Sequence, residues 1–179
     1  MKDILVYLDV DGVGSHWLKY MEALLPDNLN MAIVNKAPNR GEILRSVYQD
    51  NPHFFAQLEP YHPYGSLIAT LKSLGVTLRI LTARGNDHPN PQTVTDDKLY
   101  WLNKHFDIDR RHVYVVAESK DKAAWAKPNA ILIDDYDRNC DEWVAAGGHA
   151  IQVDDCKWVL DEVLSRLHKA IDEITKSGN

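Results

Sequence analysis

Two aspartates, Asp9 and Asp11, stand one residue apart directly after a short apolar stretch, residues 4–8, and Gly12 follows them. The stretch has the length and the composition of a buried strand, and a glycine permits the sharp turn that must come next. Open parallel sheets place their ligands at the carboxyl ends of their strands. Because two neighbouring carboxylates repel each other, the pair predicts a bound cation or a shared proton. A strand that ends in an ordinary Asp-Gly turn is the alternative that this stretch alone leaves open.

Polar side chains also follow three later apolar stretches of the chain. Each has an ordinary explanation, because threonines and aspartates commonly cap helices and most surface lysines are simply solvated. The carboxyl ends of parallel strands meet at one edge of a sheet, however, so together these residues predict a single site for a metal and an anion. They are Thr82 after residues 76–81, Lys120 and Lys122 after residues 113–116, and Asp134 and Asp135 after residues 130–133.

The rest of the chain must position these residues, and from Tyr64 onward it alternates between helical and strand patterns. This alternation predicts an α/β fold, a Rossmann-like parallel sheet of five strands with helices on both faces. Residues 15–64 are less regular and predict a small helical cap after the first strand, here called the insertion, whereas residues 1–14 and 65–179 form the core. Strands are expected at 4–8, 76–81, 113–116, 130–133 and 149–153, and helices at 15–25, 40–49, 64–74, 95–106, 138–146 and 158–174.

Two helices have apolar faces that predict their packing. In the helix at 95–106 the expected face is Leu99, Leu102 and Phe106, and the proline-rich residues before it are expected to be a loop. In the final helix the residues expected to pack on the sheet are Val159, Val163, Leu167, Ala170 and Ile174.

Composition narrows the class of protein. The chain has 179 residues with a formal net charge of −6 and no run of basic residues, which argues against a nucleic-acid polymer as partner. Cys140 and Cys156 are too few and too unpatterned for a disulfide framework or a zinc site, so both are expected to be free thiols. The amino-terminal residues resemble neither a signal peptide nor a membrane span. We therefore expect a cytoplasmic protein with no membrane partner.

The order of the polar residues, Asp-x-Asp, Thr, Lys and Asp-Asp, resembles that of the haloacid dehalogenase-like (HAD-like) phosphatases over most of the chain. Receiver domains also use acids, a threonine and a lysine around magnesium, but their lysine comes last, whereas here the acid pair does. The segments that carry the resemblance are LDVDGV, ILTARG, ESKDKAAWAKP and ILIDDYDRN.

This resemblance implies a phosphatase that uses Mg²⁺. Asp9 would be the nucleophile that forms an aspartyl-phosphate, and Asp11 the general acid and base. Asp9, the main-chain carbonyl of Asp11 and Asp134 would hold the metal, and Asp135 would reach it through a water or a neighbouring ligand. Residues expected beside the phosphate are Gly12, Thr82, Ala83 and Lys122, with Lys120 as the alternative lysine and Lys127 as a less favoured one.

Further segments resemble the 5′(3′)-deoxyribonucleotidases, also called C-type 5′-nucleotidases. In that branch the insertion covers the nucleotide and aromatic side chains stack on its base. Aromatic candidates are Trp17, Phe54, Phe55 and Tyr61, of which Phe54 is also a natural core residue; Arg84 and Tyr136 are further candidate substrate contacts. Two positions depart from the branch, because Ala83 replaces a serine and Tyr136 an arginine. The segments are NPHFFAQLEP at 51–60, DKLYWLNKHF at 97–106, and Asn139, Trp143 and AAGG at 145–148 beyond the acid pair.

The expected activity is therefore hydrolysis of nucleoside 5′-monophosphates, with deoxyribonucleotides favoured. A phosphatase for another small metabolite, such as a sugar phosphate, remains the alternative within the superfamily. A nucleotide-binding module without chemistry is the alternative from another class, and the acidic charge disfavours a role on polynucleotide ends. An apolar face on the final helix or on the insertion would allow a homodimer.

Overall fold

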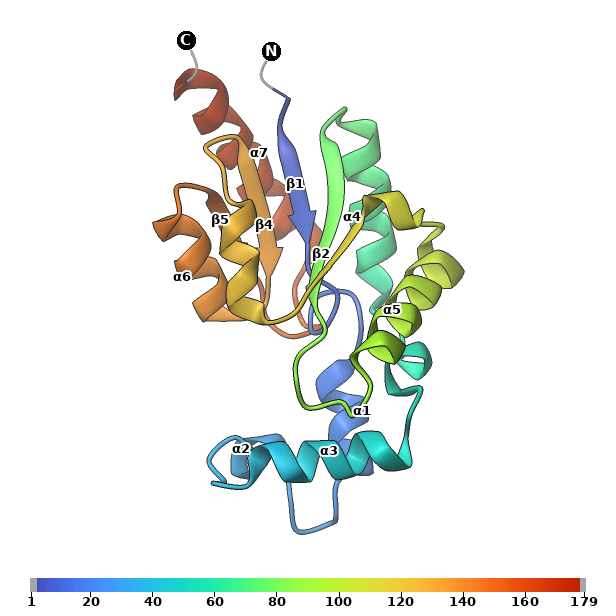
Figure 1. The fold of residues 1–179 in the computed structure, drawn as a ribbon. Coiled ribbons are helices and arrows are strands. Elements are labelled where there is room, and N and C mark those ends of the chain that lie inside the picture. The colour runs from blue at the N-terminus through green and yellow to red at the C-terminus, as the bar shows by residue number, and fades with distance from the viewer. Residues whose placement is uncertain (1–2, 178–179) are drawn as a thin grey trace.

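A computed structural model describes residues 3–177 of the chain and contains a parallel sheet of five strands in the order β3-β2-β1-β4-β5 (Figure 1). Every neighbouring pair is parallel, and β1 occupies the centre of the sheet. The predicted fold class is confirmed. The strands are β1 (Leu5–Leu8), β2 (Thr77–Ala83), β3 (Val113–Val116), β4 (Ala130–Asp134) and β5 (His149–Gln152).

Helices connect the strands and cover both faces of the sheet. Val6 and Leu8 of β1 face the side that α4 and α7 cover, whereas Tyr7 faces the side occupied by α6 and η3. This alternation is the period-two pattern of a strand buried on both faces. The α-helices are α1 (Trp17–Leu24), α2 (Met31–Val34), α3 (Arg40–Asp50), α4 (His62–Ser73), α5 (Pro91–Phe106), α6 (Asp137–Ala145) and α7 (Leu160–Ser177), and the 3₁₀ turns are η1 (Phe54–Gln57), η2 (Arg110–His112) and η3 (Ser119–Trp125).

The register of the central strands brings their carboxyl ends level. Leu8 of β1 lies opposite Ile80 of β2 and Ile133 of β4, so Asp9 and Asp134 leave the sheet side by side. The backbone N–H of Asp9 still donates to the carbonyl of Ile133 at 3.0 Å, which holds the exit of β1 against β4.

The turn after β1 requires glycine at position 12. Gly12 has a φ of +76°, and a Cβ there would lie 2.2 Å from a carboxylate oxygen of Asp135. A residue with a side chain would therefore be strained and would displace Asp135. The glycine lets the acid loop and the Asp135 side chain approach each other.

The insertion leaves and rejoins the core at two adjacent crossings of the backbone. The N–H of His16 donates to Glu59 O at 3.0 Å, and the N–H of Tyr61 donates to Gly14 O at 2.7 Å. Between the crossings, α1, α2 and α3 lie beyond the carboxyl ends of the strands, away from both termini (Figure 1). The division at 15–64 stays a prediction, and residues 62–64 lie in α4, which packs on the sheet and on α7.

Three of the differences between the expected and the observed elements change what is buried or what belongs to a strand. α5 begins at Pro91 instead of residue 95, because the side chain of Asn90 caps the helix and a proline in the first turn loses no intrahelical hydrogen bond. β2 extends through Thr82 and Ala83 instead of ending before them. Val159 precedes α7 and is 53% exposed, whereas Val163, Leu167, Ala170 and Ile174 are buried as predicted.

Within residues 3–177, the helices are all too short or too polar to span a membrane.

Tyr64 links α4 to the acid loop. Its side chain is fully buried, and its hydroxyl donates to the main-chain oxygen of Asp9 at 2.9 Å. A Cβ on Gly14 would lie 2.8 Å from the Tyr64 ring, so the loop backbone rests directly on it. The Tyr64 hydroxyl therefore holds the acid loop, residues 9–14, against α4.

Replacing Tyr64 by phenylalanine removes this hydrogen bond and leaves a buried carbonyl without its donor. We expect Tyr64→Phe to lower the free energy of unfolding by about 1–2 kcal/mol, measured by urea denaturation. Tyr100→Phe is the matched control, because Tyr100 is 56% exposed and should tolerate the change. Equal stability of the two variants would contradict this account of Tyr64.

Candidate active site

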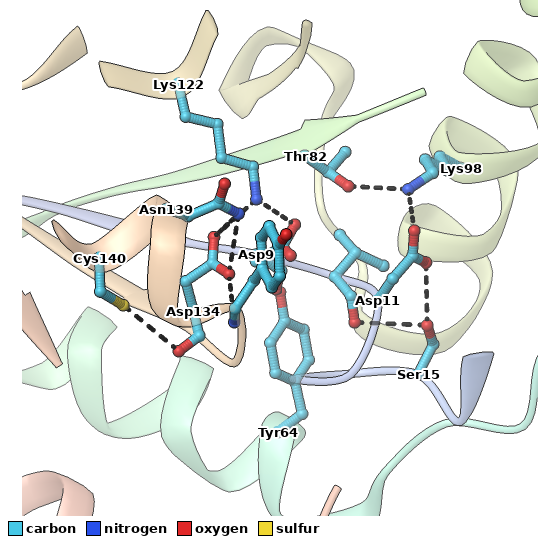
Figure 2. A network of polar contacts seen from close by, with 12 residues as sticks. Asp9, Asp11, Ser15, Tyr64, Thr82, Lys98, Lys122, Asp134, Asn139 and Cys140 are labelled. Carbon is cyan, nitrogen blue, oxygen red and sulfur yellow. Dashed lines mark hydrogen bonds and ion pairs between the residues drawn. The ribbon is translucent and has the colours of Figure 1, made fainter. Parts of the chain in front are cut away.

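Charged side chains from the residue after β1, from η3 and from β4 meet at the carboxyl edge of the sheet (Figure 2). Asp9 and Asp134 are almost completely buried, with 6% and 0% of their surface exposed. Lys122, which is 2% exposed, places its Nζ 3.0 Å from Asp9 Oδ1 and 2.7 Å from Asp134 Oδ2. Burial alone would lower the pKa of Lys122, but the two carboxylates outweigh this effect and raise it above its ordinary value.

The other candidate lysine lies outside this group. Lys120 is exposed and pairs with Glu118 at 2.8 Å. Since η3 turns one lysine inward and the other outward, Lys122 is the one that the structure brings to the two aspartates.

Asp9, Asp134 and Asp135 each offer a carboxylate oxygen to a common centre, and these oxygens lie within 4.8 Å of one another. Burial, and then the charges of Asp9, Asp134 and Asp155, raises the pKa of Asp135 to about 8. Burial and the charge of Asp9 also raise the pKa of Asp134, against the opposing effect of Lys122.

These oxygens fit a hard divalent cation. Asp9 Oδ1 is buried and, among the described residues, none donates to it with hydrogen-bond geometry, although Lys122 is near. Several carboxylate oxygens around one point, one of them without a donor, are the ligands that Mg²⁺ and Ca²⁺ prefer. A cation would also neutralise the charges that, after burial, raise the pKa values of Asp134 and Asp135.

The sequence also predicts that Asp11 and Asp135 contribute to the metal site. The carboxylate of Asp135 lies in the cluster itself, and its expected contact with the metal through a water or a neighbouring ligand stays a prediction. The carboxylate of Asp11 points instead toward Lys98 (Figure 2). The expected contact through the main-chain carbonyl of Asp11 stays a prediction.

Asn139 holds Asp134 in position. In the sequence, only the resemblance to the C-type 5′-nucleotidases points to this residue. Its Nδ2 lies 3.1 and 3.0 Å from the two carboxylate oxygens of Asp134, and the N–H of Tyr136 donates to Oδ1 at 2.9 Å. Asn139 is in the first turn of α6, and the chain turns directly from β4 into that helix. A buried amide one turn after a strand-end acid is the signal that could have identified it.

Lys98 is a buried charged residue of the site that the sequence patterns did not identify. It is 1% exposed, and its Nζ donates to Asp11 Oδ2 at 2.5 Å and to Thr82 Oγ1 at 2.8 Å (Figure 2). The buried face of α5 runs through Val94, Lys98 and Trp101, whereas the expected face began at Leu99, which is only partly buried. A lysine spaced at helical intervals among apolar residues was the available signal.

A cavity of about 730 Å³ opens between this edge and the insertion. Its volume suits a small organic ligand. Two of the expected phosphate contacts already have partners. Gly12 lines the cavity, but its N–H donates to Ser15 O at 3.0 Å. Thr82 is fully buried, and its hydroxyl accepts from Lys98. The other expected contacts in the lining are Trp17, Phe55, Ala83, Arg84 and Tyr136.

The aromatic candidates differ in what their rings face. Phe54 is fully buried in an aromatic cluster, and Phe55 is 4% exposed and lies beneath Lys98. The Tyr61 hydroxyl donates to Trp158 O at 2.8 Å, so it links the end of the insertion to the residues before α7. Trp17 is partly buried and Tyr136 is 47% exposed, and both line the cavity.

The arrangement can transfer an anionic group. A buried carboxylate beside an ammonium and a cation-binding cluster can attack an electrophile whose negative charge the two cations neutralise. Phosphate esters meet this description.

Comparison with solved structures supports the fold. An HAD hydrolase (family IA, variant 3) from Entamoeba histolytica is similar with a TM-score of 0.59 and 11% identity, over 96% of this chain and 99% of that one. An HAD family hydrolase from Deinococcus radiodurans, with bound phosphate and sodium, has a TM-score of 0.56 and 10% identity over 94% and 96%. A hydrolase from Pseudomonas syringae has a TM-score of 0.56 and 14% identity over 92% and 97%.

Comparison with curated protein sequences gave no match. The family described as "5′ nucleotidase, deoxy (Pyrimidine), cytosolic type C protein" matches residues 3–160, which is most of the chain. The chain therefore belongs to the cytosolic type C 5′-nucleotidase family and is a phosphatase with the HAD-like fold.

Proposed function

We propose that the protein is a Mg²⁺-dependent phosphatase that hydrolyses nucleoside 5′-monophosphates, deoxyribonucleotides in preference, through an aspartyl-phosphate. The observation that carries this proposal is the buried Asp9 carboxylate, which pairs with Lys122, belongs to the acidic cluster and lines the large cavity. The family description supports the nucleotide and the deoxy sugar.

The reaction has two steps. An Asp9 carboxylate oxygen attacks phosphorus, the ester P–O bond breaks, and Asp11 gives a proton to the departing nucleoside oxygen. Water then attacks the phosphorus of the aspartyl-phosphate and gives a proton to Asp11. Inorganic phosphate leaves, and the Asp9 carboxylate is regenerated.

Positive charge around the phosphate lowers the barrier to both steps. Lys122 supplies one fixed charge beside Asp9. Mg²⁺, held by Asp9, Asp134, Asp135 and the Asp11 carbonyl, would neutralise further charge on the phosphate. Arg84 lines the cavity with its Nε buried and, among described residues, without a partner, so it is suited to a phosphate oxygen.

The nucleoside would occupy the part of the cavity next to the insertion. Trp17 of the insertion and Tyr136, between β4 and α6, offer aromatic surface to the cavity, and stacking on such a ring contributes ~1–3 kcal/mol per base. We also propose a cytosolic location from the family description, which agrees with the free thiols Cys140 and Cys156. The homodimer stays a prediction.

A substrate panel tests the activity. We expect phosphate release that requires Mg²⁺ and is fastest with deoxyribonucleoside 5′-monophosphates, against ribonucleotides and sugar phosphates at neutral pH. Phosphate release from sugar phosphates alone would support a phosphatase but contradict nucleotides as its substrates. Absence of release from every compound would argue against the proposed reaction.

Asp9→Asn tests the nucleophile. The amide has nearly the same shape but is a very poor nucleophile, so we expect turnover to fall by at least ~10³-fold while urea denaturation shows a folded protein. Asp172→Asn, an exposed acid on α7, is the matched control and should keep its rate. If Asp9→Asn retained most of the wild-type turnover, the aspartyl-phosphate would be excluded.

Trp17→Leu tests the base contact. We expect KM for the preferred nucleotide to rise about tenfold, with little change for ribose 5-phosphate, because only the nucleotide has a base to stack. Trp17→Phe keeps a ring and should restore most of the affinity. An equal rise in KM for both substrates would show that Trp17 does not recognise the base.

A further inference from the structure

Lys98 is a buried charge that the proposed reaction does not yet use. It comes from α5, an element separate from those that carry Asp9, Lys122 and Asp134. A lysine at 1% exposure has lost its water and persists only where its donors find partners. Its partners therefore show what it is placed to do.

The ammonium group contacts three features of the site. It donates to Asp11 Oδ2 and to Thr82 Oγ1, and it lies over the Phe55 ring, 5.0 Å from the centroid. Cation–π attraction supplies the third contact. Asp11 and Phe55 line the cavity, and Phe55 belongs to the insertion, so Lys98 connects the acid loop to the insertion.

The two carboxylate oxygens of Asp11 are held unequally. Oδ2 accepts from the charged Lys98, whereas Oδ1 accepts from the neutral Ser15 hydroxyl at 3.3 Å. That hydroxyl lies equally far from Val10 O, and its single proton can serve only one of them at a time. Oδ2 is therefore anchored, and Oδ1 is the oxygen available to carry a proton.

Contacts on both sides keep Lys98 in place. Asp97 Oδ1 lies 2.9 Å from His53 Nδ1, and Trp101 Nε1 donates to Leu58 O at 2.7 Å. Both partners belong to the segment of the insertion around η1. α5 is therefore fastened next to the lysine, and Nζ has little freedom to leave Asp11.

We infer that Lys98 is a positioning residue, which holds Asp11 by Oδ2 so that Oδ1 faces the leaving oxygen of the substrate. The inference rests on the proposed function, in which Asp11 protonates that oxygen. Lys98 is not part of the cavity lining, and in this proposal it acts on the reaction through Asp11. The competing explanation is a buried ion pair that only supports the fold.

The leaving group separates the two explanations. A nucleoside oxygen leaves as a strongly basic alkoxide and needs the proton, whereas p-nitrophenolate leaves readily without one. A defect in proton donation must therefore be large for a nucleotide and small for p-nitrophenyl phosphate. A defect in folding or in phosphate binding would lower both rates alike.

The experiment compares kcat/KM of Lys98→Met for thymidine 5′-monophosphate and p-nitrophenyl phosphate. This ratio reports steps up to formation of the aspartyl-phosphate, so the later hydrolysis does not obscure it. We expect a fall of about 30-fold or more for the nucleotide and less than about threefold for the aryl ester. Lys104→Met, an exposed lysine on the same helix, is the control and should change neither value.

Adding Asp11→Asn completes the test. Because Lys98 acts through Asp11, the double variant should be about as active as Asp11→Asn alone. Equal losses on both substrates, or losses that multiply in the double variant, would overturn the inference. If Asp11→Asn alone shows no dependence on the leaving group, then the proposed acid is wrong instead. Lys98→Gln, which keeps an N–H donor, gives the same comparison should Lys98→Met not fold.

Discussion

The site depends on keeping three carboxylates close together where water is scarce. Asp9, Asp134 and Asp135 converge on one point, and Lys122 offers a single positive charge against them. Burial, together with the excess negative charge that the group keeps when all three are ionised, raises the pKa values of Asp134 and Asp135. Such a cluster is stable only when a cation or a proton completes it. The strand register and the Gly12 turn hold these acids together, so the folded protein always requires a cation or a proton at this point.

Much of this arrangement could be predicted from the sequence, because it follows from local patterns. Apolar stretches that end in acids predicted β1 and β4, and the rule that parallel strands end at one edge predicted that Asp9 and Asp134 would meet. β3 was predicted at residues 113–116 and lies there. Lys122 was preferred to Lys120, and only Lys122 of the two is turned to the aspartates.

What could not be predicted depends on contacts between distant segments. Lys98 looked like one more polar residue of a helix, because its partner Asp11 is far away in sequence and α5 began earlier than expected. Val159 continued an apolar pattern, yet the helix starts after it, so it lies exposed. Local periodicity identifies a helix more reliably than it identifies where the helix begins, and the starting residue decides what is buried.

The structure also explains how two identical side chains, two residues apart, can have different roles. Asp9 faces Lys122 and the other two acids of the cluster, whereas Asp11 faces Lys98 and Ser15. The proposed reaction needs one carboxylate that stays ionised and attacks, and another that exchanges a proton with each half of the cycle. Two separate buried lysines give the two acids separate surroundings, even though the same turn carries both. Because the second lysine lies on α5, beside the contacts that hold the insertion, the environment of Asp11 is tied to the segment that would cover the substrate.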